Sequence, residues 1–418
     1  MTRRKHIALV APLLVKSATG PSFYIADLVP RLCEAGYEVT VLASDCINPG
    51  GTPDEFVTID SRAHLKLFRV KGRLNRRVCR VPEMVRWLRK NAAQIDVVDI
   101  QGIWYWVTAD IARECQHAGI PYVITPHGMM GRWDWAKKPL VKRTYFSVRL
   151  RRSWRYAAAI RFLSAGELDS CMIPPASPVA MIPTAVDLPC RMDMEAGARV
   201  KARLMVPQNT SLVVFLGRVT PQKGVYELVR AFDLVSHRCP EAVLAIAGRL
   251  DGDYGRAVQE CAAQLGSRDK IHILGSVSPD EKTDLLCAAS VFVTLSRNEG
   301  LSSAVLEALG NCVPVVVTKD SNLPEVREYS AGIVTEVDIA KAADAIATLL
   351  LQREERNKMG ANAQRLISER FTWISVLPKL MALYDQIASR GTALELRCSV
   401  YVNAPPTPES LSHNQIDI

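Results

Sequence analysis

The chain has 418 residues, 48% of them hydrophobic and 23% charged, which excludes wholesale disorder and predicts two or three domains with large cores. Its net charge of +9 favours an anionic partner such as a nucleotide, a phosphorylated lipid, a membrane surface or a nucleic acid. The eleven cysteines include no C-x-x-C pair, which argues against a zinc site and favours a reducing, cytoplasmic compartment.

The N-terminal basic residues run into the apolar stretch Ile7–Val15, which contains Pro12 and is followed by no cleavage site of small residues. We interpret this stretch as a first β-strand rather than a signal peptide. The sequence has no run of 18 uncharged apolar residues, so we predict no transmembrane helix.

Apolar runs of strand length alternate with helix-length segments along most of the chain. Continuous Val, Ile and Leu runs are typical of parallel strands buried on both faces, and the helices between them supply the crossovers. The predicted strands are Ile7–Ala11, Glu38–Leu42, Val97–Ile100, Tyr122–Thr125, Ala159–Leu163 and Val179–Ile182, then Leu212–Leu216, Ala242–Ala247, Ile271–Leu274, Val291–Leu295, Pro314–Val317 and Gly332–Val334. Six plus six strands predict an α/β protein with two doubly wound, Rossmann-like domains.

The domain boundary is expected in the polar stretch after the first six strands. We place one domain at residues 1–190 and the other at residues 191–372, followed by a helix at 373–389. The remaining residues, 390–418, are rich in Pro, Ser, Thr and Asn and are predicted to form a flexible tail.

Two segments of the first domain are strongly basic, Lys66–Lys90 and Lys137–Arg155. The second also contains aromatic residues, namely Tyr145, Phe146, Trp154 and their neighbours. A basic and aromatic helical surface suits an anionic membrane. The alternative is an ordinary solvated helix face.

The first candidate site element is a strand, a loop and a helix around residues 296–307. Gly300, Leu301, Ser302 and Ser303 form the predicted junction, where a serine could cap the helix and free backbone N–H groups could bind a phosphate. Glu299 lies in the loop, and Glu307 follows one turn past Ser303 on the same helix face. Two carboxylates at this spacing suit the recognition of sugar and ribose hydroxyls.

The second element follows the first strand of the second domain and contains Gly217, Arg218, Lys223 and Gly224. Two cations from one turn are suited to a diphosphate leaving group, on which negative charge develops. The alternative is a pair of surface cations.

The third element, Pro126-His127-Gly128-Met129, ends a strand of the first domain, at the edge where open α/β sheets bind ligands. His127 is a candidate for chemistry, although a lone histidine is more often structural. Gly20, after the first strand, is a weaker signal for the close approach of a ligand.

Together these motifs resemble the family 4 retaining glycosyltransferases, called glycosyl transferases group 1, over roughly residues 5–388. The E-x7-E pair is Glu299 and Glu307, the G-R…K-G element is that at 217–224, and Gly275-Ser-Val277 fits the strand end that faces the donor base. The resemblance implies the GT-B fold, with an acceptor-side and a nucleotide-sugar donor domain facing across a cleft. It also implies that the helix at 373–389 returns to the first domain.

The resemblance further implies roles for these residues. Arg218 and Lys223 would bind the donor diphosphate, Glu299 would hold the transferred sugar, and Glu307 the ribose. Val277 would contact the base, and His127 would approach the donor sugar. Such enzymes usually need no metal or other cofactor, and the leaving phosphate is thought to help deprotonate the acceptor. One departure is Gln101, which stands where the family often has a histidine.

The leading hypothesis is therefore a cytoplasmic hexosyltransferase, peripheral on the inner face of the plasma membrane, that builds a surface polysaccharide or lipid-linked glycan. A sugar-nucleotide 2-epimerase shares the predicted architecture and is one alternative. A catalytically silent nucleotide-sugar binding protein is another. Nucleic-acid binding would explain the charge but not the two carboxylates, so we expect no nucleic-acid partner.

Overall fold

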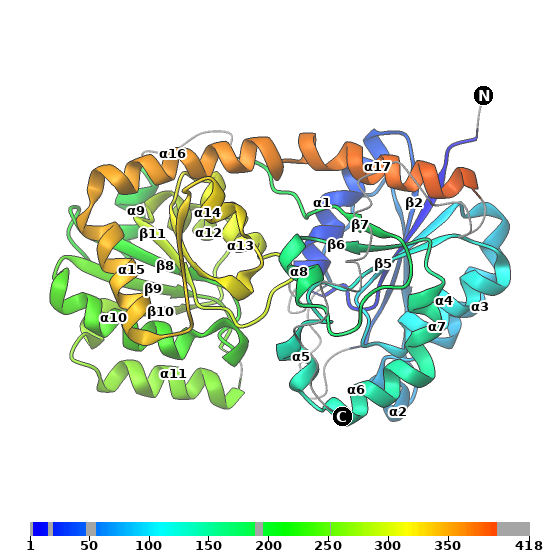
Figure 1. The fold of residues 1–418 in the computed structure, drawn as a ribbon, viewed down its shortest axis with the longest axis horizontal. Coiled ribbons are helices and arrows are strands. Elements are labelled where there is room, and N and C mark those ends of the chain that lie inside the picture. Colours follow the sequence, from blue (N-terminus) through cyan, green and yellow to red (C-terminus); the bar gives the residue numbers. More distant parts are fainter. Residues whose placement is uncertain (1–2, 16–19, 47–55, 189–194, 251, 391–418) are drawn as a thin grey trace, which may run out of the picture. The chain divides into compact units, whose positions relative to one another are not determined.

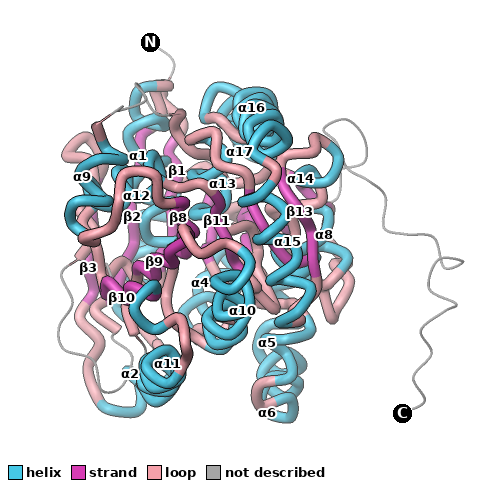
Figure 2. The backbone as a smooth tube through the Cα atoms, turned by 90° about the vertical axis from the view of Figure 1, so that its left-hand side faces the viewer, coloured by secondary structure: helices cyan, strands magenta, loops and turns pink. Residues whose placement is uncertain are grey.

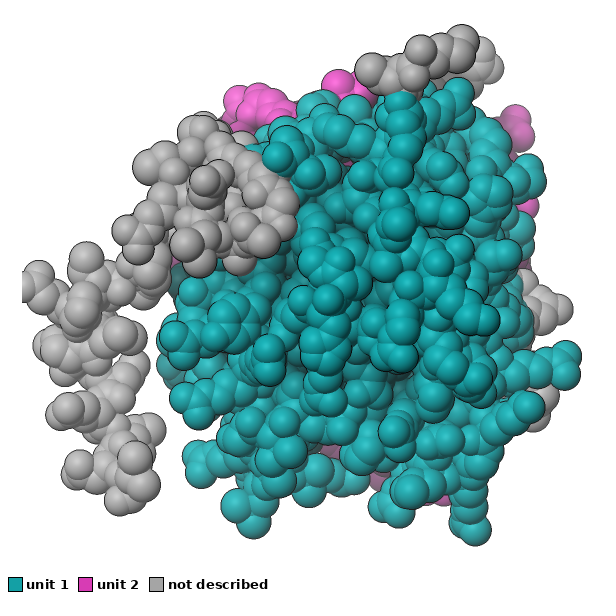
Figure 3. Space-filling model, turned by 90° about the vertical axis from the view of Figure 1, so that its right-hand side faces the viewer, with its two compact units in different colours: residues 1–183, 377–418 teal, residues 184–376 magenta. Residues whose placement is uncertain are grey.

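The computed structural model describes residues 3–15, 20–46, 56–188, 195–250 and 252–390. The chain forms two compact units, coloured separately in Figure 3: Met1–Pro183 with Leu377–Ile418, and Thr184–Val376. The chain therefore passes between the units at Pro183 and again at Val376, inside its last helix. The predicted tail lies outside the described residues from position 391 onward.

The first unit contains a seven-stranded parallel sheet in the order β3-β2-β1-β4-β5-β6-β7. Its strands are β1 (His6–Ala11), β2 (Glu38–Ser44), β3 (His64–Phe68), β4 (Val97–Gln101), β5 (Tyr122–Thr125), β6 (Ala159–Phe162) and β7 (Val179–Met181). The sequence predicted six of these strands. It missed β3, an edge strand whose residues are mostly exposed.

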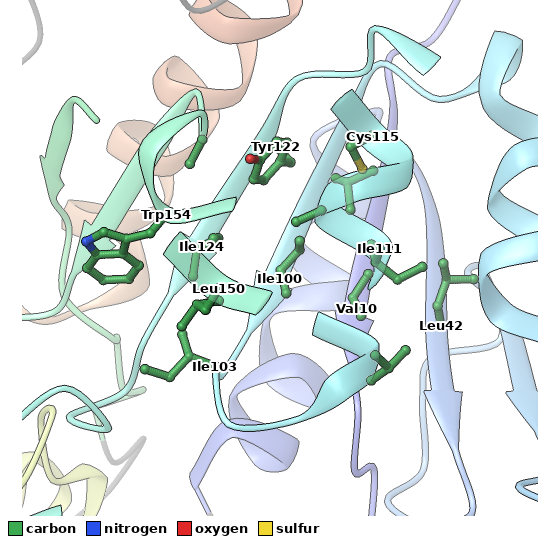
Figure 4. Packing of buried hydrophobic residues seen from close by; sticks show 14 of the residues in the cluster. Val10, Leu42, Ile100, Ile103, Ile111, Cys115, Tyr122, Ile124, Leu150 and Trp154 are labelled. Carbon is green, nitrogen blue, oxygen red and sulfur yellow. The ribbon is translucent and has the colours of Figure 1, made fainter. Parts of the chain in front are cut away.

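Burial explains why the central strands form. Every residue of β1 is buried, and β1 pairs with β2 on one side and β4 on the other, so Ile7 lies opposite both Val39 and Val97. Figure 4 shows this core, in which Ile111 of the helix Trp106–Ala118 packs over the sheet. Two-sided burial accounts for strand sequences without polar alternation.

Helices lie on both faces of this sheet (Figures 1 and 2). The helices of this unit are α1 (Gly20–Glu34), α2 (Arg73–Val78), α3 (Pro82–Asn91), α4 (Trp106–Ala118), α5 (Arg132–Ala136), α6 (Pro139–Tyr145), α7 (Arg151–Arg155) and α8 (Ala165–Asp169), with α17 (Trp373–Arg390) joining from Leu377 onward. A π-helical turn, Phe146–Leu150, connects α6 to α7.

The second unit contains a six-stranded parallel sheet in the order β10-β9-β8-β11-β12-β13, which confirms the predicted doubly wound α/β fold. Its strands are β8 (Ser211–Leu216), β9 (Ala242–Ala247), β10 (Ile271–Gly275), β11 (Val291–Thr294), β12 (Val315–Thr318) and β13 (Gly332–Thr335). Its helices are α9 (Ala196–Arg203), α10 (Val225–Arg238), α11 (Gly252–Gln264), α12 (Pro279–Ala288), α13 (Ser303–Gly310), α14 (Glu325–Glu328), α15 (Ile339–Leu351) and α16 (Arg353–Arg370). The strand order reverses between β8 and β11, which is where such sheets bind ligands.

The segment Lys137–Arg155 differs from the predicted basic and aromatic surface. In Lys137–Arg155, the rings of Phe146 and Trp154 are buried in the core, so they do not face solvent. The exposed apolar side chains of that segment are aliphatic: Leu140, Val141 and Val148 are 76%, 64% and 73% exposed. No helix in the part of the chain that the structure describes is both long and apolar enough to span a membrane.

Candidate functional site

Two loops of the second unit meet at the carboxyl ends of β8 and β11, and a glycine allows their contact. Gly224 has a φ of 66°, and a Cβ built on it would lie 2.2 Å from the backbone oxygen of Leu295. Such a position accepts only glycine, for both its left-handed backbone and its lack of space. The loop after β8 is thereby held against the loop after β11.

Hydrogen bonds join the two loops along their length. The backbone N–H of Arg297 donates to the carbonyl of Gln222 (2.8 Å), and the Gln222 amide donates to the carbonyl of Asn298 (2.6 Å). The Arg297 guanidinium then pairs with Glu227 of α10 (2.7 Å). These contacts fix the position of Lys223, which follows Gln222 directly.

Lys223 and Glu299, both predicted site residues, form an ion pair between the two loops. Lys223 Nζ lies 2.5 Å from Glu299 Oε1, and the Ser296 hydroxyl donates to the same oxygen at 2.7 Å. The side chains are 19% and 10% exposed, so water screens this pair less than a surface pair. The pair places a cation at the carboxyl edge of the sheet, in a fixed position.

The strand β12 supports the Glu299 loop from below. Thr318, the last residue of β12, donates its hydroxyl to the carbonyl of Ser296, and Asn322 donates its amide to the carbonyl of Glu299. Ser296, Thr318 and Asn322 are all buried. The loop is therefore anchored through its backbone, which leaves the Glu299 carboxylate to hold Lys223.

The helix α13 begins at the predicted junction, but its cap differs from the prediction. Ser302 is the N-cap residue, with an extended backbone (φ −81°, ψ 111°), yet its side chain makes no capping hydrogen bond. Gly300 and Leu301 are buried, and Ser303 is partly exposed. The backbone N–H groups at the start of α13 thus follow Glu299 closely in the chain, and no serine hydroxyl caps them.

Glu307, the second predicted carboxylate, lies on α13 and pairs with a residue the sequence did not single out. Lys282 Nζ of α12 lies 2.9 Å from Glu307 Oε1, with side chains that are 40% and 28% exposed. Glu307 and Glu299 therefore each face a lysine. Because the Glu307 pair is more exposed, solvent or a ligand hydroxyl can compete for it more readily.

Glycines end three neighbouring strands of the second unit. Gly217, Gly248 and Gly275 follow or end β8, β9 and β10, with φ of 149°, 146° and 69°. Gly217 donates its N–H to Ala247 (3.0 Å), and Gly248 donates to Gly275 (2.7 Å). A Cβ on Gly248 would lie 1.8 Å from the Gly217 oxygen, so these strand ends pack backbone on backbone.

The other predicted donor residues lie beside these strand ends in the chain. Arg218 follows Gly217 directly and is partly buried. Val277, also partly buried, lies in the loop between β10 and α12. Among the described residues, no cluster of three or more His, Cys, Asp or Glu side chains could hold a metal ion.

His127 lies in the first unit, in a tight turn after β5. The N–H of Met129 donates to the carbonyl of Pro126 (3.1 Å), and the two central residues, His127 and Gly128, have φ of 53° and 74°. Two positive φ values define a type I′ turn, which explains the glycine. Histidine is among the few other residues that tolerate this region.

A buried glutamate that the sequence did not single out holds this turn. Glu167 of α8 accepts hydrogen bonds from the N–H groups of Gly128 (2.5 Å) and Leu163 (2.7 Å). Burial raises the pKa of Glu167 to about 7, and the two N–H donors partly oppose that rise. The turn is thus attached to a group that titrates near neutrality.

The His127 imidazole is neutral. Burial, followed by the positive charge of Arg161, lowers the pKa of His127 to about 3. Its Nε2 lies 2.6 Å from Oε1 of Gln101 at the end of β4, and its ring packs edge-on against Tyr24. Gln101, noted only as a departure from the family pattern, is therefore a direct partner of His127.

Gly20, the last predicted site residue, opens α1. It is exposed, and a Cβ built there would meet nothing within 4 Å. The fold of the first unit therefore does not itself require glycine at this position.

The two doubly wound sheets and the Lys223–Glu299 loops define the class of protein, and comparisons agree. The family model for glycosyl transferases group 1 matches residues 199–366, and the model for the glycosyl transferase 4-like domain matches residues 19–185. Together the two matches span well over half of the chain. The chain belongs to the family 4 glycosyltransferases, which have the GT-B fold.

Two relatives illustrate the similarity, at 28% and 23% identity. A GDP-mannose-dependent alpha-(1-6)-phosphatidylinositol monomannoside mannosyltransferase of Mycobacterium tuberculosis is 28% identical over 298 residues, covering 68% of this chain and 75% of that protein. A mannosylfructose-phosphate synthase of Agrobacterium fabrum is 23% identical over 415 residues, covering 91% and 89%.

Two solved structures show the same fold. Sucrose-phosphate synthase from Thermosynechococcus elongatus has a TM-score of 0.73 at 18% identity and covers 92% of this chain and 100% of that one. Anabaena HepE in complex with UDP and glucose has a TM-score of 0.70 at 17% identity, covering 92% and 98%.

Proposed function

We propose that the protein transfers a hexose, with retention, from a nucleotide-sugar donor to a glycan or lipid-linked acceptor in surface polysaccharide synthesis. The observation that carries this proposal is the Lys223–Glu299 ion pair. It joins the loops after β8 and β11, which hydrogen bonds hold together. The names of relatives support the donor class, since one uses GDP-mannose and one structure contains UDP and glucose.

The charges of the second unit suit the departure of a nucleoside diphosphate. Lys223 and Arg218 would stabilise the negative charge that develops on the diphosphate as the glycosidic bond breaks. The proposal includes no metal ion, because these two cations supply the positive charge. Glu299 fixes the lysine at 2.5 Å, so little reorganisation is needed during the reaction.

The carboxylates then serve as hydroxyl acceptors. Glu299 would accept from hydroxyls of the transferred sugar, and Glu307 from the ribose diol, in competition with Lys282. Val277 would contact the base. In the first unit, the neutral His127 would hydrogen-bond the donor sugar, and the departing phosphate would take the acceptor proton.

The first experiment identifies the donor. UDP-, GDP- and TDP-sugars are screened for thermal stabilisation of the full chain, and the stabilising donor is then incubated with lipid-pyrophosphate sugar acceptors. Product analysis should show transfer that depends on the acceptor. Conversion of the donor to an epimer without acceptor would contradict the proposal, and binding without any turnover would favour a silent binding protein.

We also propose that the first unit docks on an anionic membrane through the segment Lys137–Arg155. The specific support is the exposed group Leu140, Val141 and Val148, which shares this helical segment with eight basic residues. Aliphatic side chains would enter the interface while the basic side chains contact anionic headgroups. One relative acts on a phosphatidylinositol mannoside, which is compatible with a lipid acceptor.

Liposome flotation tests this docking. The protein should float with anionic vesicles and much less with neutral ones, and added salt should reduce binding. Leu140→Ser with Val148→Ser should reduce recovery, whereas Leu351→Ser, at an apolar position of the second unit that is 60% exposed, should not. Equal recovery with neutral and anionic vesicles would remove the electrostatic basis of the proposal.

A further inference from the structure

Gln101 occupies the position that decides which nitrogen of His127 carries its proton. A neutral imidazole has one N–H and one bare nitrogen, and the partner of one nitrogen fixes the state of the other. His127 Nε2 lies 2.6 Å from Gln101 Oε1, and Gln101 is only 2% exposed. The question is therefore which end of the buried amide faces the ring.

The position of Asp99 helps to identify the orientation of the Gln101 amide. Asp99 lies two residues before Gln101 on β4 and therefore projects from the same face of the strand. Asp99 is fully buried, and burial raises its pKa, an effect that Arg161 and the neighbouring polar side chains, Gln101 among them, oppose. The amide oxygen faces His127, which leaves the amide nitrogen on the side of Asp99. The opposite orientation would turn the amide oxygen toward Asp99 Oδ1, an acceptor atom that already lacks a donor.

The remaining polar atoms agree with this orientation. Asp99 Oδ1, Gln101 Nε2 and Thr125 Oγ1 are buried and have no partner at regular hydrogen-bond distance among the described residues. Gln101 and Thr125 pair in register on β4 and β5, so their side chains project from the same face of the sheet as that of Asp99. Buried polar atoms without partners are costly, which favours the orientation that brings a donor to the carboxylate.

Asp99 itself is fixed by two distant elements. Tyr384 of α17 donates its hydroxyl to Asp99 Oδ2 at 2.6 Å. The fully buried Arg161 of β6 supplies a positive charge that opposes the effect of burial on Asp99. Arg161 is in turn held by the Tyr24 hydroxyl (2.5 Å) and by the carbonyls of the last two residues before the unit boundary, Ile182 (2.9 Å) and Pro183 (2.7 Å).

We propose that Gln101 is a positioning residue that holds His127 in the Nε2–H tautomer and leaves Nδ1 as a hydrogen-bond acceptor. In the proposed function, on which this last step rests, Nδ1 accepts from a hydroxyl of the donor sugar. The turn at His127, clamped by Glu167, and the edge-on ring of Tyr24 keep the imidazole in this orientation. The Gln101 amide thus determines which ring nitrogen of His127 can accept a hydrogen bond.

Nuclear magnetic resonance tests the tautomer without substrate. The full chain is labelled with 15N-histidine, and the signals of His127 are assigned among the seven histidines by their loss in His127→Gln. At pH 7.5, Nε2 should appear as the protonated nitrogen and Nδ1 as the bare one. Nδ1–H in the wild-type protein would overturn the proposal.

Three variants connect the tautomer to the rate. Gln101→Met preserves the length of the side chain and removes the acceptor, so it should mix the tautomers and lower kcat by about 10-fold, the loss expected for one hydrogen bond. Gln101→Glu keeps an oxygen toward His127 but places a carboxylate beside both the ring and Asp99, which favours a doubly protonated imidazole, so it should protonate Nδ1 and also lower kcat. The matched control is Gln116→Met, whose amide binds Tyr122 (2.7 Å), and it should change neither.

The outcomes separate this inference from the proposed function. Unchanged His127 signals in Gln101→Met would overturn the positioning role even in an active enzyme. If the tautomer responds as expected while no nucleotide sugar is turned over, the positioning role holds and the sugar-transfer function fails.

Discussion

In the second unit, Lys223 and Glu299 hold each other by opposite charge, whereas in the first unit His127 is kept neutral by burial and oriented by an amide. The ion pair suits a ligand group that gains negative charge during the reaction, because the Lys223 cation is already in place. The neutral imidazole suits an uncharged hydroxyl, because binding a hydroxyl depends on the direction of one hydrogen bond rather than on the strength of the electric field. The candidate site residues of the two units therefore suit different ligand groups, a charged one in the second unit and an uncharged one in the first.

The largest effect should come from the charged arrangement. Lys223→Ala removes a cation from the proposed diphosphate site and leaves Glu299 without its ion-pair partner, so kcat/KM should fall by about 100-fold to 1,000-fold. Glu299→Ala should lose at least about 100-fold, and the double variant should lose much less than the product of the two. The control is Lys270→Ala, a lysine of the same unit whose Nζ donates to the carbonyl of Pro240 (2.9 Å), and initial rates provide the measurement. Near-normal rates in both single variants would refute the site assignment.

The next largest effect should come from Gly224, where the loop after β8 contacts the loop after β11. Substituting it tests whether this contact is needed to hold the Lys223–Glu299 pair. Gly224→Ala should cost about 3 kcal/mol of stability, because its Cβ meets the Leu295 carbonyl and its φ is 66°. Gly275→Ala has nearly the same φ, 69°, but no atom within 4 Å, and should cost only about 1 kcal/mol. Urea unfolding measures both. Equal losses would show that backbone strain, not the contact between loops, sets the requirement.

A third prediction concerns the clamp on the His127 turn. The pKa of Glu167 is about 7 in the folded protein against an ordinary 4.5, so folding favours its protonated form. Its contribution to stability is complete below pH 4.5 and is lost as pH rises to 7, a change of about 2–3 kcal/mol. Glu167→Gln should remove this part of the pH dependence of unfolding. A stability difference from wild type that stays constant over pH 4.5–7 would contradict the raised pKa.

The smallest effect is expected at the exposed pair of the second unit. Lys282→Ala frees Glu307 on a surface where ion pairs contribute less than about 1 kcal/mol, so stability should barely change. Because the lysine competes with the proposed ribose diol, KM for the donor should change by no more than about 5-fold, with kcat nearly constant. A loss in kcat as large as that of Lys223→Ala would show that the two lysines are not different in kind.

The strands of both sheets were predictable because two-sided burial leaves a continuous apolar run, as in Val291–Thr294. The strand β3 was not, since it is a short, mostly exposed edge strand with a lysine at its centre. The aromatic residues of Lys137–Arg155 were assigned to the surface, yet Phe146 and Trp154 are core residues. Helical spacing shows that residues share a face but not which way that face points.

The same contrast applies to the candidate site. Gly217, Lys223 and Glu299 lie in short loops next to strands, so their motifs reveal them. The partners of His127 come from separate elements, and nothing in the local sequence links Gln101 or Glu167 to it. One signal was present, since a lone arginine inside the apolar strand β6 predicts a buried charge that requires partners.

The backbone contact between Gly217 and Gly248 limits how this protein could be redesigned. Even one methyl group at Gly248 would meet the Gly217 oxygen at 1.8 Å, so substitutions here would displace the ends of β8 and β9 before any ligand is involved. If the proposed donor site is redesigned, Val277, a partly exposed loop position outside this contact, is the better position to substitute. Backbone packing therefore requires glycine at position 248, whereas the loop that contains Val277 can accept substitutions without disturbing these strand ends.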